Sequence, residues 1–124
     1  MALAIAAIAA DAPSFTGEYA DKKLLGGNAV FQMSLEQSGN TVSIWFSAVR
    51  NDGQGADPEA TATGKVTGKG AVEFSFTDSF KNSGTGTIAR ASDDIVVSMK
   101  ATRVADSRCV PFYGQNMRLK RVKK

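Results

Sequence analysis

The sequence predicts an all-β protein, an antiparallel up-and-down meander that closes as a small, roughly eight-stranded β-barrel. Short runs of alternating apolar and polar residues begin at residue 15, and this period of two is typical of half-buried strands. Glycine-rich turns separate the runs, with 12 glycines against 3 prolines in 124 residues. No sustained 3.6-residue periodicity competes after residue 12. A two-sheet β-sandwich is the alternative that this pattern leaves open.

Eight segments fit the strand pattern in order along the chain. They are residues 15–20, 29–37, 41–50, 60–67, 71–78, 85–91, 95–103 and 116–122. The stretches between them are polar, rich in glycine, or irregular, as at residues 22–28, 51–59 and 105–115. Short turns favour pairing of strands that are neighbours in sequence, and closure into a barrel removes exposed edges.

The strand at 71–78 has the clearest signal. Its apolar and polar residues alternate strictly: Val72, Phe74 and Phe76 against Glu73, Ser75 and Thr77. In residues 41–50 the apolar face ends on Phe46 and Ala48, and Trp45 lies on the opposite face. The glycines of residues 82–87 do not form a phosphate loop, because no Gly-Lys-Ser/Thr follows. We expect them to mark a close approach, a bulge or a bend in a strand.

The N-terminal residues 1–12 differ from the rest, residues 13–124, which we expect to form the single β-barrel domain. Residues 1–10 are all apolar and too short to span a bilayer, which needs about 20 residues. They match the hydrophobic part of a signal peptide, and Ala7-Ile8-Ala9 supplies a small-x-small cleavage motif. No Lys or Arg precedes them, so we expect a truncated signal peptide and a periplasmic or secreted protein. The alternative is a cytoplasmic protein with an alanine-rich N-terminal segment.

The positive charge is concentrated at the end of the chain. Residues 1–102 carry eight basic and eleven acidic side chains, a balance of −3, whereas residues 103–124 carry seven basic and one acidic, a balance of +6. Such a cluster is suited to an anionic surface. The candidate contacts are Arg118, Lys120, Arg121, Lys123 and Lys124. The alternative is a solvated edge strand, whose lysines prevent aggregation. No aromatic residues are interleaved with these basic residues, so we expect no specific nucleic-acid binding.

Several catalytic chemistries are excluded by composition. The chain has no histidine, so it holds neither a Ser-His-Asp triad nor an imidazole metal site, and its single cysteine cannot form an internal disulfide. Cys109 lies beside Arg108 and is either a reactive thiolate or, as we expect, a buried packing residue. Asp93 and Asp94 form the adjacent acidic pair, but they lie in a predicted turn. We therefore expect no enzyme, no metal and no cofactor.

The segment 103–115 is the main recognition candidate. It combines Arg103, Arg108, Phe112 and Tyr113 in an irregular loop, and arginine with aromatic residues is the composition of binding hot spots. In the alternative interpretation Phe112 and Tyr113 plug one barrel end and the arginines stay solvated. Trp45, with Tyr19, is a further candidate for a ligand cavity or an exposed patch. In the alternative interpretation Trp45 belongs to the core, as a single tryptophan on a strand more often does.

The opening Thr16-Gly17-Glu18-Tyr19, followed by strands and a basic final segment, resembles the avidin-like and lipocalin-like β-barrels. The stretches at residues 47–49 and 100–104 are also similar to avidin-type segments. The resemblance implies a barrel with one plugged end. Avidin-type biotin pockets use several tryptophans and this chain has only Trp45, so biotin binding is not predicted.

These observations favour a non-catalytic binding module that recognises a protein or small ligand through loops and one barrel end. One alternative is a surface-associated protein that docks on anionic lipid or polysaccharide through its basic C-terminal strand. Another is a small enzyme that uses carboxylate or Cys109 chemistry. The strand pattern does not decide whether the barrel interior is hollow.

Overall fold

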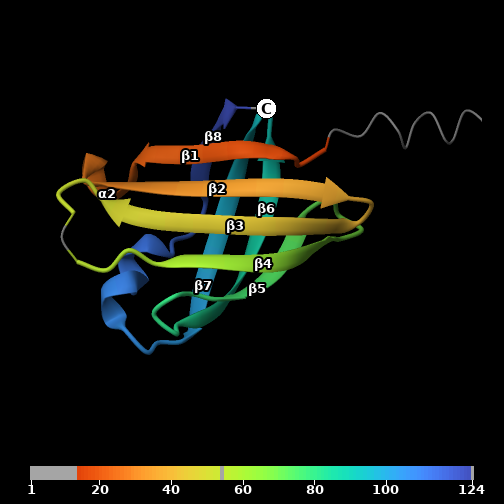
Figure 1. Cartoon of the computed structure of the whole chain (residues 1–124). Coiled ribbons are helices and arrows are strands. Elements are labelled where there is room, and N and C mark those ends of the chain that lie inside the picture. The colour runs from red at the N-terminus through yellow and green to blue at the C-terminus, as the bar shows by residue number, and fades with distance from the viewer. Residues whose placement is uncertain (1–13, 54, 124) are drawn as a thin grey trace, which may run out of the picture.

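The computed structural model describes residues 14–53 and 55–123, and it shows a closed barrel of eight antiparallel strands in sequence order (Figure 1). The strands are β1 (Gly17–Lys23), β2 (Ala29–Ser38), β3 (Thr41–Arg50), β4 (Glu59–Val66), β5 (Val72–Thr77), β6 (Ser83–Ala91), β7 (Asp94–Arg103) and β8 (Met117–Lys123). Each strand pairs with the next, and β8 returns to pair with β1. The predicted eight-stranded barrel is confirmed, and the sandwich is excluded.

Two short helical elements lie in stretches predicted to be irregular. A single turn, α2 (Leu24–Gly27), joins β1 to β2, and Leu25 (φ 56°) and Gly26 (φ 70°) take left-handed backbone conformations within it. The 3-10 helix η1 (Ser107–Phe112) follows β7, and the side chain of Asp106 caps it by accepting a hydrogen bond from the Arg108 N–H. Both elements lie at the same end of the barrel (Figure 1).

Inward-facing side chains fill the barrel, and an eight-stranded barrel has an interior just wide enough for this. Phe31 and Phe46 stack with their ring centroids 5.5 Å apart, and Phe76 meets Phe46 edge to face at 5.4 Å. The largest fully buried side chains also include Met33 and Met99. Such tight packing leaves the outer wall and the two ends as the surfaces on which a partner can bind.

The glycines of β6 make this packing possible. Gly84 pairs with Phe76 and Gly86 with Phe74 across the β5–β6 ladder, and both glycines face inward. A Cβ atom on Gly84 would lie 2.8 Å from the Phe76 ring, and one on Gly86 would overlap the Phe74 ring. The expected role of this segment, a close approach within a strand, is confirmed.

The barrel is closed unevenly between its first and last strands. The ladder between β1 and β8 covers only Glu18 to Ala20 on the β1 side, and it shifts register after Glu18. The remainder of β1, up to Lys23, therefore diverges from β8 and leaves a groove on the outer wall. In the described part of the chain, no helix has the length and apolar character needed to cross a membrane.

Candidate functional site

One barrel end is closed by the segment that the sequence favoured for recognition. Helix η1 and the residue after it direct Phe112 (0% exposed) and Tyr113 (9% exposed) into the core. The Tyr113 ring centroid lies 5.1 Å from that of Phe76 and 6.1 Å from that of Phe46. Phe112 and Tyr113 thus plug one end of the barrel, as in the alternative that the sequence left open. Neither ring is exposed to an external ligand.

A buried polar network fixes this plug. The Tyr113 hydroxyl donates to Asp78 Oδ2 at 2.5 Å, and the Asn82 side-chain amide donates to the same oxygen at 3.0 Å. Asn82 Oδ1 accepts the backbone N–H groups of Ala105 and Asp106 at 2.7 and 2.8 Å. Asp78 and Asn82 are 5% and 0% exposed. The burial of Tyr113 itself, followed by its hydrogen bond with Asp78, raises the pKa of Tyr113. The arrangement stabilises the fold and exposes no reactive group.

The two arginines of the same segment lie on the surface. Arg108 makes an ion pair of 2.6 Å with Asp106 and places its guanidinium 5.7 Å from the centre of the Phe80 ring. The hydrogen bonds from Arg108 lower the pKa of Asp106 to about 2. Arg103 is exposed at the end of β7. Arg108 is therefore held by its own carboxylate partner, whereas Arg103 extends toward solvent.

Cys109 is a packing residue, as expected. Its side chain is 0% exposed inside the plug. Burial, followed by the charges of Asp78 and Asp106, raises the pKa of the thiol to about 11. A nucleophilic cysteine needs the opposite conditions, a lowered pKa and access to solvent.

Tyr19 is also part of the fold rather than of an open site. It is 1% exposed, donates to the Phe15 carbonyl at 2.8 Å, and accepts a hydrogen bond of 3.0 Å from Arg121. Burial raises the pKa of Tyr19, and the Arg121 charge opposes this shift. Arg121 and Arg90 cover the rings of Tyr19 and Phe15 at 5.0 and 4.4 Å. These four residues close the end of the barrel opposite to η1.

The remaining cations predicted to contact an anionic surface differ in their surroundings. Arg118 forms an ion pair of 3.2 Å with Asp94. Lys120 is exposed on the outer wall, and no ion pair to it occurs among the described residues. Lys123 ends β8, and Lys124 lies outside the described residues. Lys120 is thus the cation of this group most available to a ligand.

A groove of about 350 Å³ runs along the junction of β1 and β8, and we call it the seam groove. Its lining residues are Ala20, Asp21, Lys22, Lys23, Arg118, Lys120, Arg121 and Val122. The sequence interpretation missed Lys22 and Lys23, because it assigned Lys22 onward to a connection. Two adjacent lysines can be seen in the sequence as a positively charged pair. Their position beside β8 follows only from closure of the barrel.

Trp45 lies on the outer wall, half-buried, at the centre of strands β2, β3 and β4. Its directly paired neighbours are Ser34 on β2 and Thr61 on β4. The indole N–H donates to Glu59 Oε2 at 2.7 Å, which fixes the ring orientation. Trp45 is therefore not a core residue, and its position corresponds to the expected surface patch rather than to a cavity.

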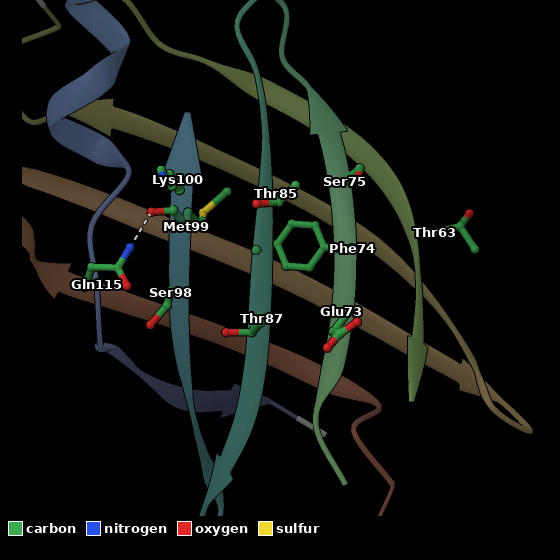
Figure 2. A pocket seen from close by; sticks show the side chains of 11 residues that line it. Thr63, Glu73, Phe74, Ser75, Thr85, Thr87, Ser98, Met99, Lys100 and Gln115 are labelled. Atoms are coloured by element: carbon green, nitrogen blue, oxygen red, sulfur yellow. Dashed lines mark hydrogen bonds between the residues drawn. The ribbon is translucent and has the colours of Figure 1, made fainter. Parts of the chain in front are cut away.

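A separate shallow depression of about 630 Å³ lies over β5, β6 and β7 (Figure 2). Five of its eleven lining residues carry short hydroxyl side chains, as at Ser75, Thr85 and Thr87. The Phe74 ring at its floor is 5% exposed and packs against the glycine position of β6. With one acidic and one basic side chain in its lining, this depression has no dominant charge.

No group of three or more acidic or cysteine side chains suited to a metal ion occurs within residues 14–53 and 55–123. Comparison with protein-family models, curated proteins and solved structures finds no match to this chain. The resemblance to avidin-like and lipocalin-like barrels therefore stays a prediction from the sequence.

Proposed function

We propose that this protein is a non-catalytic binding module that holds an anionic ligand in the seam groove. The observation that carries the proposal is the charge of the lining, five cationic side chains against the single carboxylate of Asp21. A groove lined by one sign of charge concentrates ligands of the opposite sign. This corresponds to the anionic docking that the basic C-terminal strand suggested, with Lys22 and Lys23 added from the first strand.

Three of the five cations are available to a ligand. Arg118 is engaged by Asp94, and Arg121 by Tyr19. No ion pair to Lys22, Lys23 or Lys120 occurs among the described residues, and all three are exposed. A lysine near an anionic surface contributes about 1 kcal/mol. Together the three lysines would change affinity by about 100-fold.

A binding role agrees with the chemistry of the chain. There is no histidine, and Cys109 is buried with a raised pKa. Because side chains fill the barrel interior, the outer wall is the surface on which a ligand can bind. We propose a periplasmic or secreted location on the basis of the apolar residues 1–10, which lie outside the described residues.

The test compares two variants with the same loss of charge. K22Q/K23Q/K120Q removes the available cations of the groove, and K65Q/K69Q/K100Q removes three exposed lysines elsewhere. We expect the first variant, but not the second, to lose binding to immobilised alginate and to phosphatidylglycerol vesicles. Binding by the wild type should weaken as salt rises, since the screening length is about 8 Å at physiological ionic strength. Equal losses in both variants would contradict a site in the groove.

A protein partner at the η1 end is the second candidate, favoured by a different observation. Val104 (51% exposed) precedes η1 and Val110 (37% exposed) lies within it, and the exposed Arg103 and Arg108 lie in the same segment. Apolar residues combined with arginine are suited to an interface. V104D/V110D should abolish binding of a partner that K22Q/K23Q/K120Q retains. If both variants lose it equally, the η1 end is not the site.

A further inference from the structure

The seam groove does not end at the last strand but continues across the outer wall to Trp45. A second shallow depression shares Ala20, Lys22 and Val122 with the groove and also reaches Trp45. A third shares Ser34 and Trp45 with the second and extends over β4. The three depressions form one band across β4, β3, β2, β1 and β8, and we call it the outer strip.

The chemistry of the outer strip changes along its length. Near Trp45 the polar side chains are hydroxyls, such as Ser43, and the carboxylate of Glu36, and these accept hydrogen bonds. The middle carries the polar side chains of Gln32 and Glu18. The far end carries the available lysines of the seam groove, Lys22 among them. A matching ligand therefore has hydroxyl donors at one end and anionic groups at the other.

Trp45 supplies a flat apolar surface between these polar groups. Its indole is fixed by the 2.7 Å hydrogen bond to Glu59 and flanked by Ser34 and Thr61 on the paired strands. A ring that is already oriented loses little conformational freedom on binding. An indole face bordered by hydroxyls and carboxylates matches a pyranose ring, whose C–H face is apolar and whose edge carries hydroxyls.

We propose that the ligand of the outer strip is an acidic oligosaccharide. A sugar ring stacks on Trp45, its hydroxyls donate to the carboxylates nearby, and the carboxylate or sulfate groups of further sugars are bound by Lys22 and Lys120. Because this inference names the ligand class of the seam groove, it rests on the proposed function. It adds a requirement that a simple anion site lacks, namely the aromatic ring.

The dimensions fit a chain of linked sugars rather than a single anion. Trp45 lies on β3, and β8 is three strands away around the wall through β2 and β1. With neighbouring strands about 4.8 Å apart, Trp45 and the lysine end of the strip on β8 are separated by about 14 Å. One phosphate or carboxylate spans only the lysine end, whereas an extended oligosaccharide reaches both.

The experiment measures binding of oligogalacturonate to the full chain by isothermal titration calorimetry at low salt. Trp45 is the only tryptophan, so its fluorescence reports directly whether the ring is covered. We expect the sugar acid to change this fluorescence and inorganic polyphosphate to leave it unchanged. W45A should weaken oligogalacturonate binding about tenfold, with a smaller loss for W45F, which keeps a ring.

Controls separate this inference from the proposed function. V49A truncates an exposed apolar side chain on the same strand and should bind like the wild type. K22Q/K120Q should weaken binding of both oligogalacturonate and polyphosphate, whereas W45A should weaken binding of only the former. If W45A binds oligogalacturonate normally while the lysine variant does not, the groove is a general anion site and the oligosaccharide is wrong. If the wild type binds neither ligand, the proposed function itself fails.

Discussion

The hydroxyl group of Tyr113 donates a hydrogen bond of 2.5 Å to Oδ2 of Asp78, which lies 35 residues earlier in the chain. Both side chains are buried, and Asp78 also accepts hydrogen bonds from the backbone and side chain of Asn82. This contact connects η1 to the β5–β6 turn, so the aromatic residues of the segment that looked like a recognition loop belong to the folded core.

Tyr113→Phe should therefore lower the free energy of unfolding by about 1.5–3 kcal/mol, because it removes a buried bond to a carboxylate. Urea unfolding followed by circular dichroism measures the change. Tyr19→Phe provides a comparison at the other barrel end, where the lost hydroxyl donates to the Phe15 carbonyl and accepts from Arg121. A free energy of unfolding for Tyr113→Phe equal to that of the wild type would contradict this account of the plug.

Cys109 should resist thiol reagents in the native protein and react fully in denaturant. The thiol is buried and its pKa is raised from 9.0 to about 11, so the folded protein retains the proton over a wider pH range. The stability that this group contributes is complete below pH 9 and is lost as pH rises toward 11. Labelling with a coloured disulfide reagent measures both states. Rapid native labelling at pH 8 would show that the plug opens readily.

Asp106 should titrate with a midpoint of about 2, well below its ordinary value of 3.8. Hydrogen bonds from Arg108 favour the charged carboxylate, so the associated stability is present above pH 3.8 and is lost as pH falls through 2. NMR of the carboxyl carbon measures the midpoint. Arg108→Ala should move it back toward 3.8, and an unchanged midpoint in that variant would exclude Arg108 as the cause.

Gly86→Ala should destabilise the barrel by about 1–3 kcal/mol, because the added Cβ would overlap the Phe74 ring inside a packed core. Gly68→Ala is the control. Gly68 lies in a turn with open space around the position of a Cβ, so its substitution should change stability little. Denaturant midpoints of the two variants provide the comparison, and equal midpoints would mean that β6 shifts to accept the methyl group.

Local pattern predicted the strands well, because alternation is a property of neighbouring residues. The boundaries of β3 coincide with the predicted residues 41–50, and the roles expected for Cys109 and for the β6 glycines are confirmed. The helical turns were missed because α2 spans only four residues and depends on positive φ angles, and η1 contains a proline. Neither has the repeated apolar spacing that identifies longer helices.

The candidate site was less accessible to sequence reasoning, because it depends on contacts between distant residues. Phe112 and Tyr113 have the composition of a binding loop, and their burial is decided by Phe46, Phe76 and Asp78 on other strands. The seam groove joins the first strand to the last, so adjacent lysines on β1 meet β8 only after the barrel has closed.

Arg121 was predicted to contact an anionic surface, but its hydrogen bonds indicate that it stabilises the fold. Its guanidinium donates to the Thr16 and Asp93 carbonyls at 3.2 Å and to the Tyr19 hydroxyl at 3.0 Å. Arg121→Lys keeps the charge but not the planar set of donors, so it should lower stability by about 1–3 kcal/mol. Thermal unfolding measures that loss, and binding to immobilised alginate below the transition should stay at the wild-type level. Stability equal to the wild type together with lost binding would instead make Arg121 a direct ligand contact.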